Sequence, residues 1–117
     1  MNTEIKKLQF KAYSRNQMMS PLKLRLVANL IRNKNAQIAI DELKFLNKKG
    51  SDIVLKVLES AVANANSLKG IDAKDLIVSS ISVDGAPSRR GVRFASRSRV
   101  ARLIKRRSHI NLILSEK

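Results

Sequence analysis

The sequence predicts an α+β fold in which three helices pack on one face of a small antiparallel sheet. Three segments between residues 20 and 70 carry apolar residues at helical spacing. Segments with the alternation of β-strands lie before and after them, and helices gathered ahead of paired strands are typical of this class. The chain has 117 residues, 44% of them hydrophobic, which suffices for one core and one domain.

The first elements are a short strand and a helix. Residues 8–12 alternate between apolar and polar side chains, which indicates a half-buried strand. The helix is expected to begin at Ser20 and Pro21, because serine is a good N-cap and proline suits the first helical position. It should end at residues 33–35, which read Asn-Lys-Asn. Its predicted core stripe consists of Leu24, Val27, Ala28 and Ile31.

Two more helices are predicted downstream. One runs from about residue 36 to 46 and ends at residues 48–50, Lys-Lys-Gly. The other begins with Ser51 as N-cap, has Asp52 near its positive end, and stops at Gly70. The stripes are Ala39, Ile40, Leu43 and Leu46 in the former, and Ile53, Val54, Val57, Leu58, Ala61, Val62 and Ala65 in the latter.

Two further strands are predicted at residues 76–83 and 109–114, with a turn or change of direction at residues 84–87. The segment between them has two interpretations. The spacing of Val100, Leu103 and Ile104 favours a basic helix. Continuation of the two flanking strands would instead make a hairpin with Gly91 near its tip, and periodicity alone does not decide between the two.

The net charge of +15 is concentrated in one segment. Residues 1–84 hold 14 Lys and Arg against 8 Asp and Glu. Residues 85–109 hold nine bases, eight of them Arg, and no acid. Guanidinium groups bind phosphate through two hydrogen bonds and stack on bases, so this segment predicts a polyanionic partner, nucleic acid first.

Several function classes are disfavoured by the composition. There is no Cys, there is one His, and the four glycines are scattered, which argues against metal, thiol and phosphate-loop chemistry. The Ser108-His109 pair and the carboxylates of Asp72 and Asp75 are not arranged as a catalytic set. No apolar run approaches a membrane span, and no signal peptide is expected from the first ten residues. Phe94 is the aromatic inside the basic run, where it can stack on a base or pack at a loop tip.

Three separated motifs carry a specific resemblance. Residues 20–34 read SPLKLRLVANLIRNK, residues 57–66 read VLESAVANAN, and residues 99–110 read RVARLIKRRSHI. In order, they resemble the first helix, the third helix and the closing strand of the family of bacterial large-subunit ribosomal protein twenty-two. The resemblance covers approximately residues 5–116.

The resemblance implies three helices, a three-stranded antiparallel sheet and a long protruding basic β-hairpin, and so favours the hairpin interpretation. The expected organisation is a single domain over residues 1–117, with a globular part at 1–84 and 109–117 and an arm at 85–108. In the family, the globular part sits near the exit of the nascent-peptide tunnel. The arm threads through ribosomal RNA, its tip forms part of the tunnel wall, and the protein takes part in early subunit assembly.

The expected partners are therefore large-subunit rRNA, neighbouring ribosomal proteins and the nascent polypeptide, on a cytoplasmic or organellar ribosome, with no cofactor, membrane or small-molecule substrate. The chain departs from the usual family residues at Phe94, Ala95, Ser98 and Arg107. The tip is expected at Gly91, Val92, Arg93, Phe94 and Ala95. Candidate rRNA contacts are Lys11, Lys23, Arg25, Arg32, Lys34, Arg89, Arg90, Arg93, Arg97, Arg99, Arg102, Lys105, Arg106, Arg107, Ser108 and His109.

Other classes are less consistent with the sequence. A regulatory DNA- or RNA-binding module would need a recognition helix with base-reading side chains at its N-terminal end, and none stands out. A membrane-surface peptide is disfavoured because the apolar faces have the pattern of a core. An enzyme is disfavoured by the residues available for catalysis.

Overall fold

The computed structural model describes the backbone of residues 9–46, 48–95 and 99–116, and the side chains of these residues except 88–105. Three helices and a three-stranded antiparallel sheet form the α+β fold that the sequence predicts. The elements are β1 (Gln9–Gln17), α1 (Pro21–Ile31), α2 (Ala36–Phe45), α3 (Lys49–Lys69), the short 3-10 helix η1 (Ala73–Asp75), β2 (Leu76–Ala95) and β3 (Arg99–Glu116).

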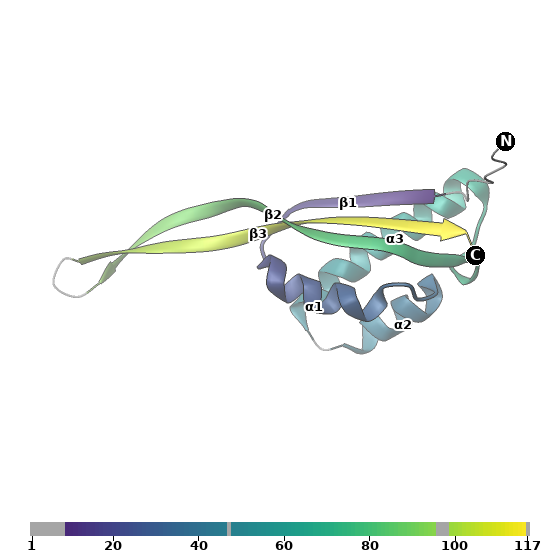
Figure 1. Ribbon diagram of the computed structural model, residues 1–117, viewed down its shortest axis with the longest axis horizontal. Helices are drawn as coiled ribbons and strands as arrows, with labels where there is room; N and C mark the ends of the chain where they lie inside the picture. The colour runs from purple at the N-terminus through teal and green to yellow at the C-terminus, as the bar shows by residue number, and fades with distance from the viewer. Residues whose placement is uncertain (1–8, 47, 96–98, 117) are drawn as a thin grey trace, which may run out of the picture.

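The last strand in the sequence, β3, is the central strand of the sheet, with β1 on one side and β2 on the other. Ile110, Leu112 and Leu114 of β3 are fully buried, whereas the residues between them are partly exposed. This period of two places one face of the sheet against the core. In Figure 1 the three helices lie beside the part of the sheet that contains β1, and β2 and β3 continue beyond them.

The core forms between the helices and this face of the sheet. All four predicted stripe residues of α1 are buried. The predicted stripes of α2 and α3 are also correct in position, although Leu46, Ile53 and Val62 are only partly buried at the edge of the core. The first strand extends to Gln17, beyond its predicted end, while Leu8 lies outside the described residues.

Two helix starts illustrate how local hydrogen bonds decide the boundaries. Ser51 was expected to cap α3, but Lys48 occupies the N-cap position and Ser51 lies buried in the first turn. Its hydroxyl donates to the carbonyls of Leu46 and Lys48, at 3.0 and 2.5 Å, so it closes the preceding loop instead. Asn35 was expected to end α1, yet its side chain accepts from the Gln37 N–H and caps α2. Gly70 ends α3 as predicted, with a left-handed φ of 65°.

The basic segment is a pair of strands, and the helix interpretation based on Val100, Leu103 and Ile104 is wrong. Antiparallel pairing of β2 with β3 continues to Ala95 opposite Arg99. The predicted turn at residues 84–87 is also absent from the described chain, where β2 passes through with a register irregularity between Ala86 and Arg89. A bulge there tolerates Pro87, which has no N–H for the ladder.

Candidate nucleic-acid interface

Arg25 of α1 and Arg32, the residue after α1, lie against the outer edge of β2. The Nε–H of Arg25 donates to the carbonyl of Val83 at 3.1 Å, and Nη2 of Arg32 donates to the carbonyl of Ile81 at 2.8 Å. Arg32 is the C-cap residue of α1, with an extended ψ of 132°, so the two side chains reach β2 from the helix and from its C-terminal end. Their acceptors are two residues apart on β2 and point the same way. We call Arg25 and Arg32 the arginine seam.

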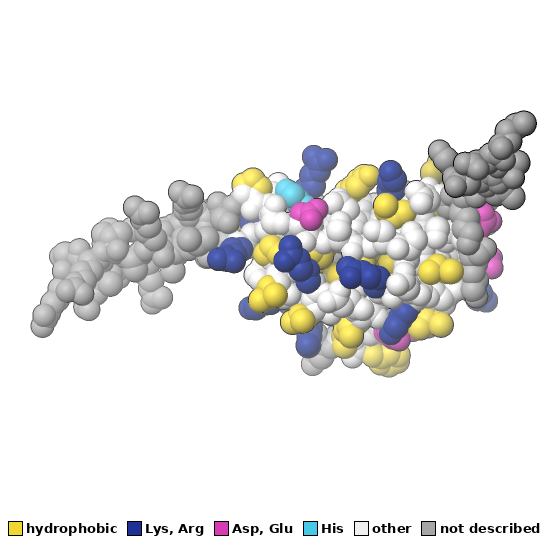
Figure 2. Space-filling view, in the orientation of Figure 1, with side chains coloured by type: hydrophobic (Ala, Val, Ile, Leu, Met, Phe, Trp, Pro, Cys, Tyr) yellow, Lys and Arg dark blue, Asp and Glu magenta, His cyan; other side chains and the backbone are white. Residues whose placement is uncertain are grey.

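The arginine seam can serve the fold and an external anion at once. An edge strand presents unpaired carbonyls, and the two guanidinium groups satisfy two of them. Each guanidinium has five N–H donors in a planar fork, and the hydrogen bond to β2 uses one of them. The remaining donors suit phosphate oxygens. Figure 2 shows Lys and Arg side chains distributed over this face of the body, where α1 and β2 lie.

The predicted lysine contacts of the body differ in their surroundings. Lys11 and Lys23 are exposed. Lys34 forms an ion pair with Glu42, with 2.7 Å between Nζ and Oε2 and side chains 42% and 41% exposed. At that exposure the pair contributes little to stability, but it compensates the charge that Lys34 would offer to a phosphate.

Ser108 and His109 sit where β3 leaves the body. Ser108 is buried, and its hydroxyl donates to the carbonyl of Met19 at 2.6 Å, which ties β3 to the segment before α1. The Nδ1 atom of His109 accepts from the backbone N–H of Asn16 at 3.1 Å. An accepting Nδ1 leaves the proton of the neutral ring on Nε2, which makes that atom the donor for an outside partner.

The backbone N–H of Asn16 reaches His109 because of a local irregularity in β1. Asn16 has a φ of 56°, and the register with β3 shifts between Ser14 and Gln17. Asparagine tolerates this left-handed conformation better than most residues. Nearby, Arg106 is exposed and Arg107 is half-buried, with a buried Nε atom that has no hydrogen-bond partner among the described residues.

The remaining predicted contacts lie on the strand pair. Their backbone is described within β2 and β3, but their side chains lie outside the description, and Arg97 lies outside it altogether. This group comprises Arg89, Arg90, Arg93, Arg99, Arg102 and Lys105.

The predicted tip residues, 91–95, belong to β2. Gly91 lies opposite Leu103, so it is not near the tip, contrary to the hairpin prediction. The register fixes this point, because Phe94 and Ala95 still pair with Val100 and Arg99. Residues 96–98, between the ends of the two strands in the sequence, lie outside the described residues.

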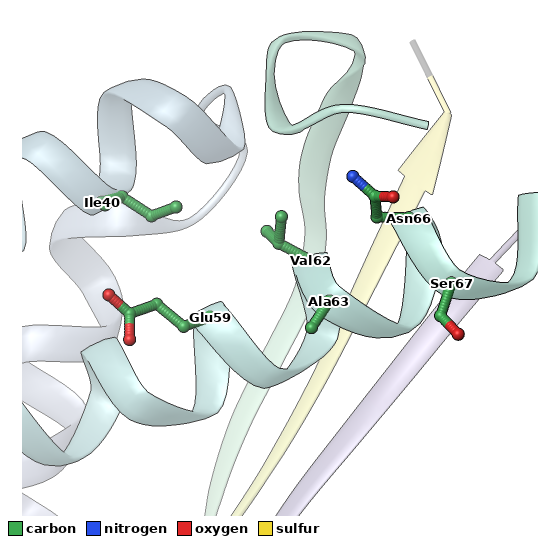
Figure 3. A pocket seen from close by; sticks show the side chains of 6 residues that line it. All are labelled: Ile40, Glu59, Val62, Ala63, Asn66 and Ser67. Atoms are coloured by element: carbon green, nitrogen blue, oxygen red, sulfur yellow. The ribbon is translucent and has the colours of Figure 1, made fainter. Parts of the chain in front are cut away.

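Two surfaces were missed by sequence reasoning. One is an exposed row on α1 that consists of Leu22, Leu26 and Leu30. Their spacing of four residues could have revealed this row in the sequence, but only the stripe that faces the core was considered. A groove of about 410 Å³ lies between α2 and α3. Figure 3 shows that Ile40 approaches it from α2 while Glu59, Val62, Asn66 and their neighbours line it from α3. With its carboxylate and no base, this groove does not suit a phosphate.

Within the described part of the chain, no group of three or more His, Cys, Asp or Glu residues is placed to hold a metal ion. None of the helices described combines the length and apolarity that crossing a bilayer requires.

The fold and surface define a small basic α+β protein whose conspicuous feature is a long strand pair that carries nine bases and no acid over residues 85–109. The family model of Ribosomal protein L22p/L17e matches residues 12–115. The chain therefore belongs to the Ribosomal protein L22p/L17e family, a structural family of the large ribosomal subunit, which confirms the resemblance seen in the sequence.

Proposed function

We propose that this protein binds large-subunit rRNA through the arginine seam and the basic strand pair, and thereby supports assembly of the subunit. The observation that carries the proposal is the charge of residues 85–109, nine bases without an acid, on strands that extend past the helices. Phosphate contacts by such a segment release counterions from the RNA, and this release drives binding.

The strand pair needs RNA to offset its own charge. A two-stranded ribbon buries little apolar surface and is marginally stable alone. Nine like charges also repel one another. Phosphates on both sides would neutralise them, so we expect the arm to be ordered chiefly by RNA. Recognition should rest on backbone and shape, since folded RNA offers phosphates and 2′-hydroxyls rather than an open major groove.

The far end of the strand pair is our candidate for the wall of the nascent-peptide tunnel. This part of the proposal rests on the family resemblance together with the pairing of β2 and β3 out to Ala95 and Arg99. Shortening both strands at this far end, by removing the pairs that Phe94 and Ala95 form with Val100 and Arg99, should alter antibiotic sensitivity or nascent-chain stalling more than subunit yield. Arg106→Glu, near the body of the protein, should instead impair assembly first.

Co-sedimentation with large ribosomal subunits in high salt tests the proposal. We expect the protein to remain with the subunit after a wash that strips loosely bound basic proteins. Recovery of the protein only in free pools or on DNA would contradict the proposal and favour a regulatory nucleic-acid-binding module.

A further inference from the structure

A second groove lies at the opposite edge of the sheet from the arginine seam. It runs between β1 and α3 and has a volume of about 290 Å³. From α3 it is lined by a stripe at helical spacing, and from β1 by three residues near the irregular end of the strand. The lining residues are Ile53, Lys56, Val57 and Ser60 from α3, and Tyr13, Ser14 and Gln17 from β1.

The lining combines the groups that hold an unpaired nucleotide. Tyr13 is 59% exposed although it is one of four aromatic residues in the chain. Tyr13 alternates with the buried Ala12 along β1, so its ring stands on the solvent face of the strand, where an exposed aromatic ring is a stacking surface for a base. Lys56 is exposed and supplies a cation, whereas Val57 is buried and contributes an apolar floor. None of the described residues lining this groove is acidic.

Backbone groups add to this set. The side chain of Asn64 donates to the carbonyl of Lys11 at 3.2 Å, so Lys11 directs its carbonyl away from β3 toward α3. Alternate residues of an edge strand point their N–H and C=O groups to the same side. The backbone of Tyr13, two residues further on, therefore also points outward and can pair with the edge of a base.

We propose that the β1–α3 groove holds an unpaired nucleotide of the bound RNA, with its base stacked on Tyr13 and its phosphate at Lys56. The inference rests on the proposed rRNA binding and assigns it a second contact, on the edge of the sheet away from the arginine seam. A protein segment is the alternative occupant, but the absence of acids in the lining and the presence of a cation favour an anionic ligand.

Equilibrium binding to a large-subunit rRNA transcript tests this site. Tyr13→Ala should weaken binding by about 5- to 150-fold, the range for one base–aromatic stack, without changing the salt dependence. Tyr13→Phe keeps the ring and is the matched control, with affinity near that of the wild type. Lys56→Gln should lower the slope of log affinity against log salt by about 0.7–0.9, and Lys56→Arg should restore it. The exposure of both residues makes loss of folding unexpected, and melting curves check this.

Ultraviolet cross-linking gives a direct readout of the same contact. We expect a nucleotide adduct on the tryptic peptide of residues 12–15, which contains Tyr13. The inference is overturned if Tyr13→Ala binds RNA as tightly as Tyr13→Phe. If the Tyr13→Ala protein binds RNA normally but is lost from subunits assembled with the other ribosomal proteins, the groove holds a protein segment instead, and the inference is overturned as well. An Arg99→Gln, Arg102→Gln, Arg106→Gln variant of the basic strand pair distinguishes failure of the groove from failure of the proposed rRNA binding. If it binds weakly while the groove variants bind normally, the groove alone is refuted; if all variants bind normally, the proposed rRNA binding fails as well.

Discussion

Removing one guanidinium of the arginine seam should destabilise the fold as well as weaken RNA binding. Arg32→Met keeps the aliphatic stem but removes the donor to the carbonyl of Ile81, a contact of 2.8 Å that is partly buried. A hydrogen bond from a charged donor contributes about 1.5–3 kcal/mol. Because water can reach the freed carbonyl, the loss should lie at the lower end, about 1.5 kcal/mol.

This loss converts into a measurable melting shift. For 117 residues the entropy of unfolding is about 0.25 kcal/mol/K, so Tm should fall by about 6 °C. Lys23→Met is the matched control, since Lys23 is an exposed cation on α1. Its effect should stay within about 0.5 kcal/mol, or about 2 °C. Thermal and urea unfolding followed by circular dichroism measure both variants.

If Arg32→Met melts at the same temperature as the Lys23→Met control, the hydrogen bond from Arg32 to β2 contributes nothing to the stability of the fold. A second measurement separates the two roles of the side chain. At a temperature where both variants are folded, Arg32→Met should lower the salt slope of rRNA binding by about 0.7–0.9 for each phosphate lost.

Three further predictions address the rest of the fold. Ser108→Ala should cost about 1–3 kcal/mol in urea unfolding because it removes the partly buried hydrogen bond to the carbonyl of Met19, and an unchanged midpoint would contradict this role. Gly70→Ala should cost about 1 kcal/mol through its φ of 65° alone, since no atom lies within 4 Å of an added Cβ, and a stabilised variant would be inconsistent with the left-handed cap. Replacing residues 88–105 with a short Asn-Gly turn should preserve cooperative unfolding, because the described core lies outside this segment; a non-cooperative transition would show that the arm belongs to the core.

The helices were predictable because burial is periodic within each of them. The stripe of α1 and the stop at Gly70 follow from spacing and from the properties of glycine. The start of α3 was not predictable at the same level. Serine is a good N-cap residue, but the Ser51 hydroxyl donates to the carbonyls of Leu46 and Lys48 in the preceding loop instead. These hydrogen bonds depend on the folded conformation of the loop, which the sequence pattern does not show.

The strand pair shows a different limit of sequence reasoning. Val100, Leu103 and Ile104 match a helix locally, and nothing within the segment contradicts that pattern. Long-range pairing with β2 decides the structure of this segment, and the pairing continues beyond Gly91, to Ala95 opposite Arg99. The hydrogen bonds of Arg25 and Arg32 to β2 could not be predicted from the sequence either. The carbonyls that accept them lie some fifty residues away in the sequence, and these carbonyls point outward only because β2 is at the edge of the sheet.

In our proposal the basic strand pair, which has no acid over residues 85–109, supplies most of the electrostatic binding to rRNA. The most direct test is the salt dependence of affinity for a large-subunit rRNA transcript, measured for the full chain and for the variant in which an Asn-Gly turn replaces residues 88–105. If the full chain contacts roughly 6–10 phosphates, its affinity should fall by about three to five decades between about 50 and 200 mM salt. The replaced segment contains seven Lys and Arg residues, so the variant's slope should be shallower by up to about 5–6 units. Equal slopes for the two proteins would contradict the account.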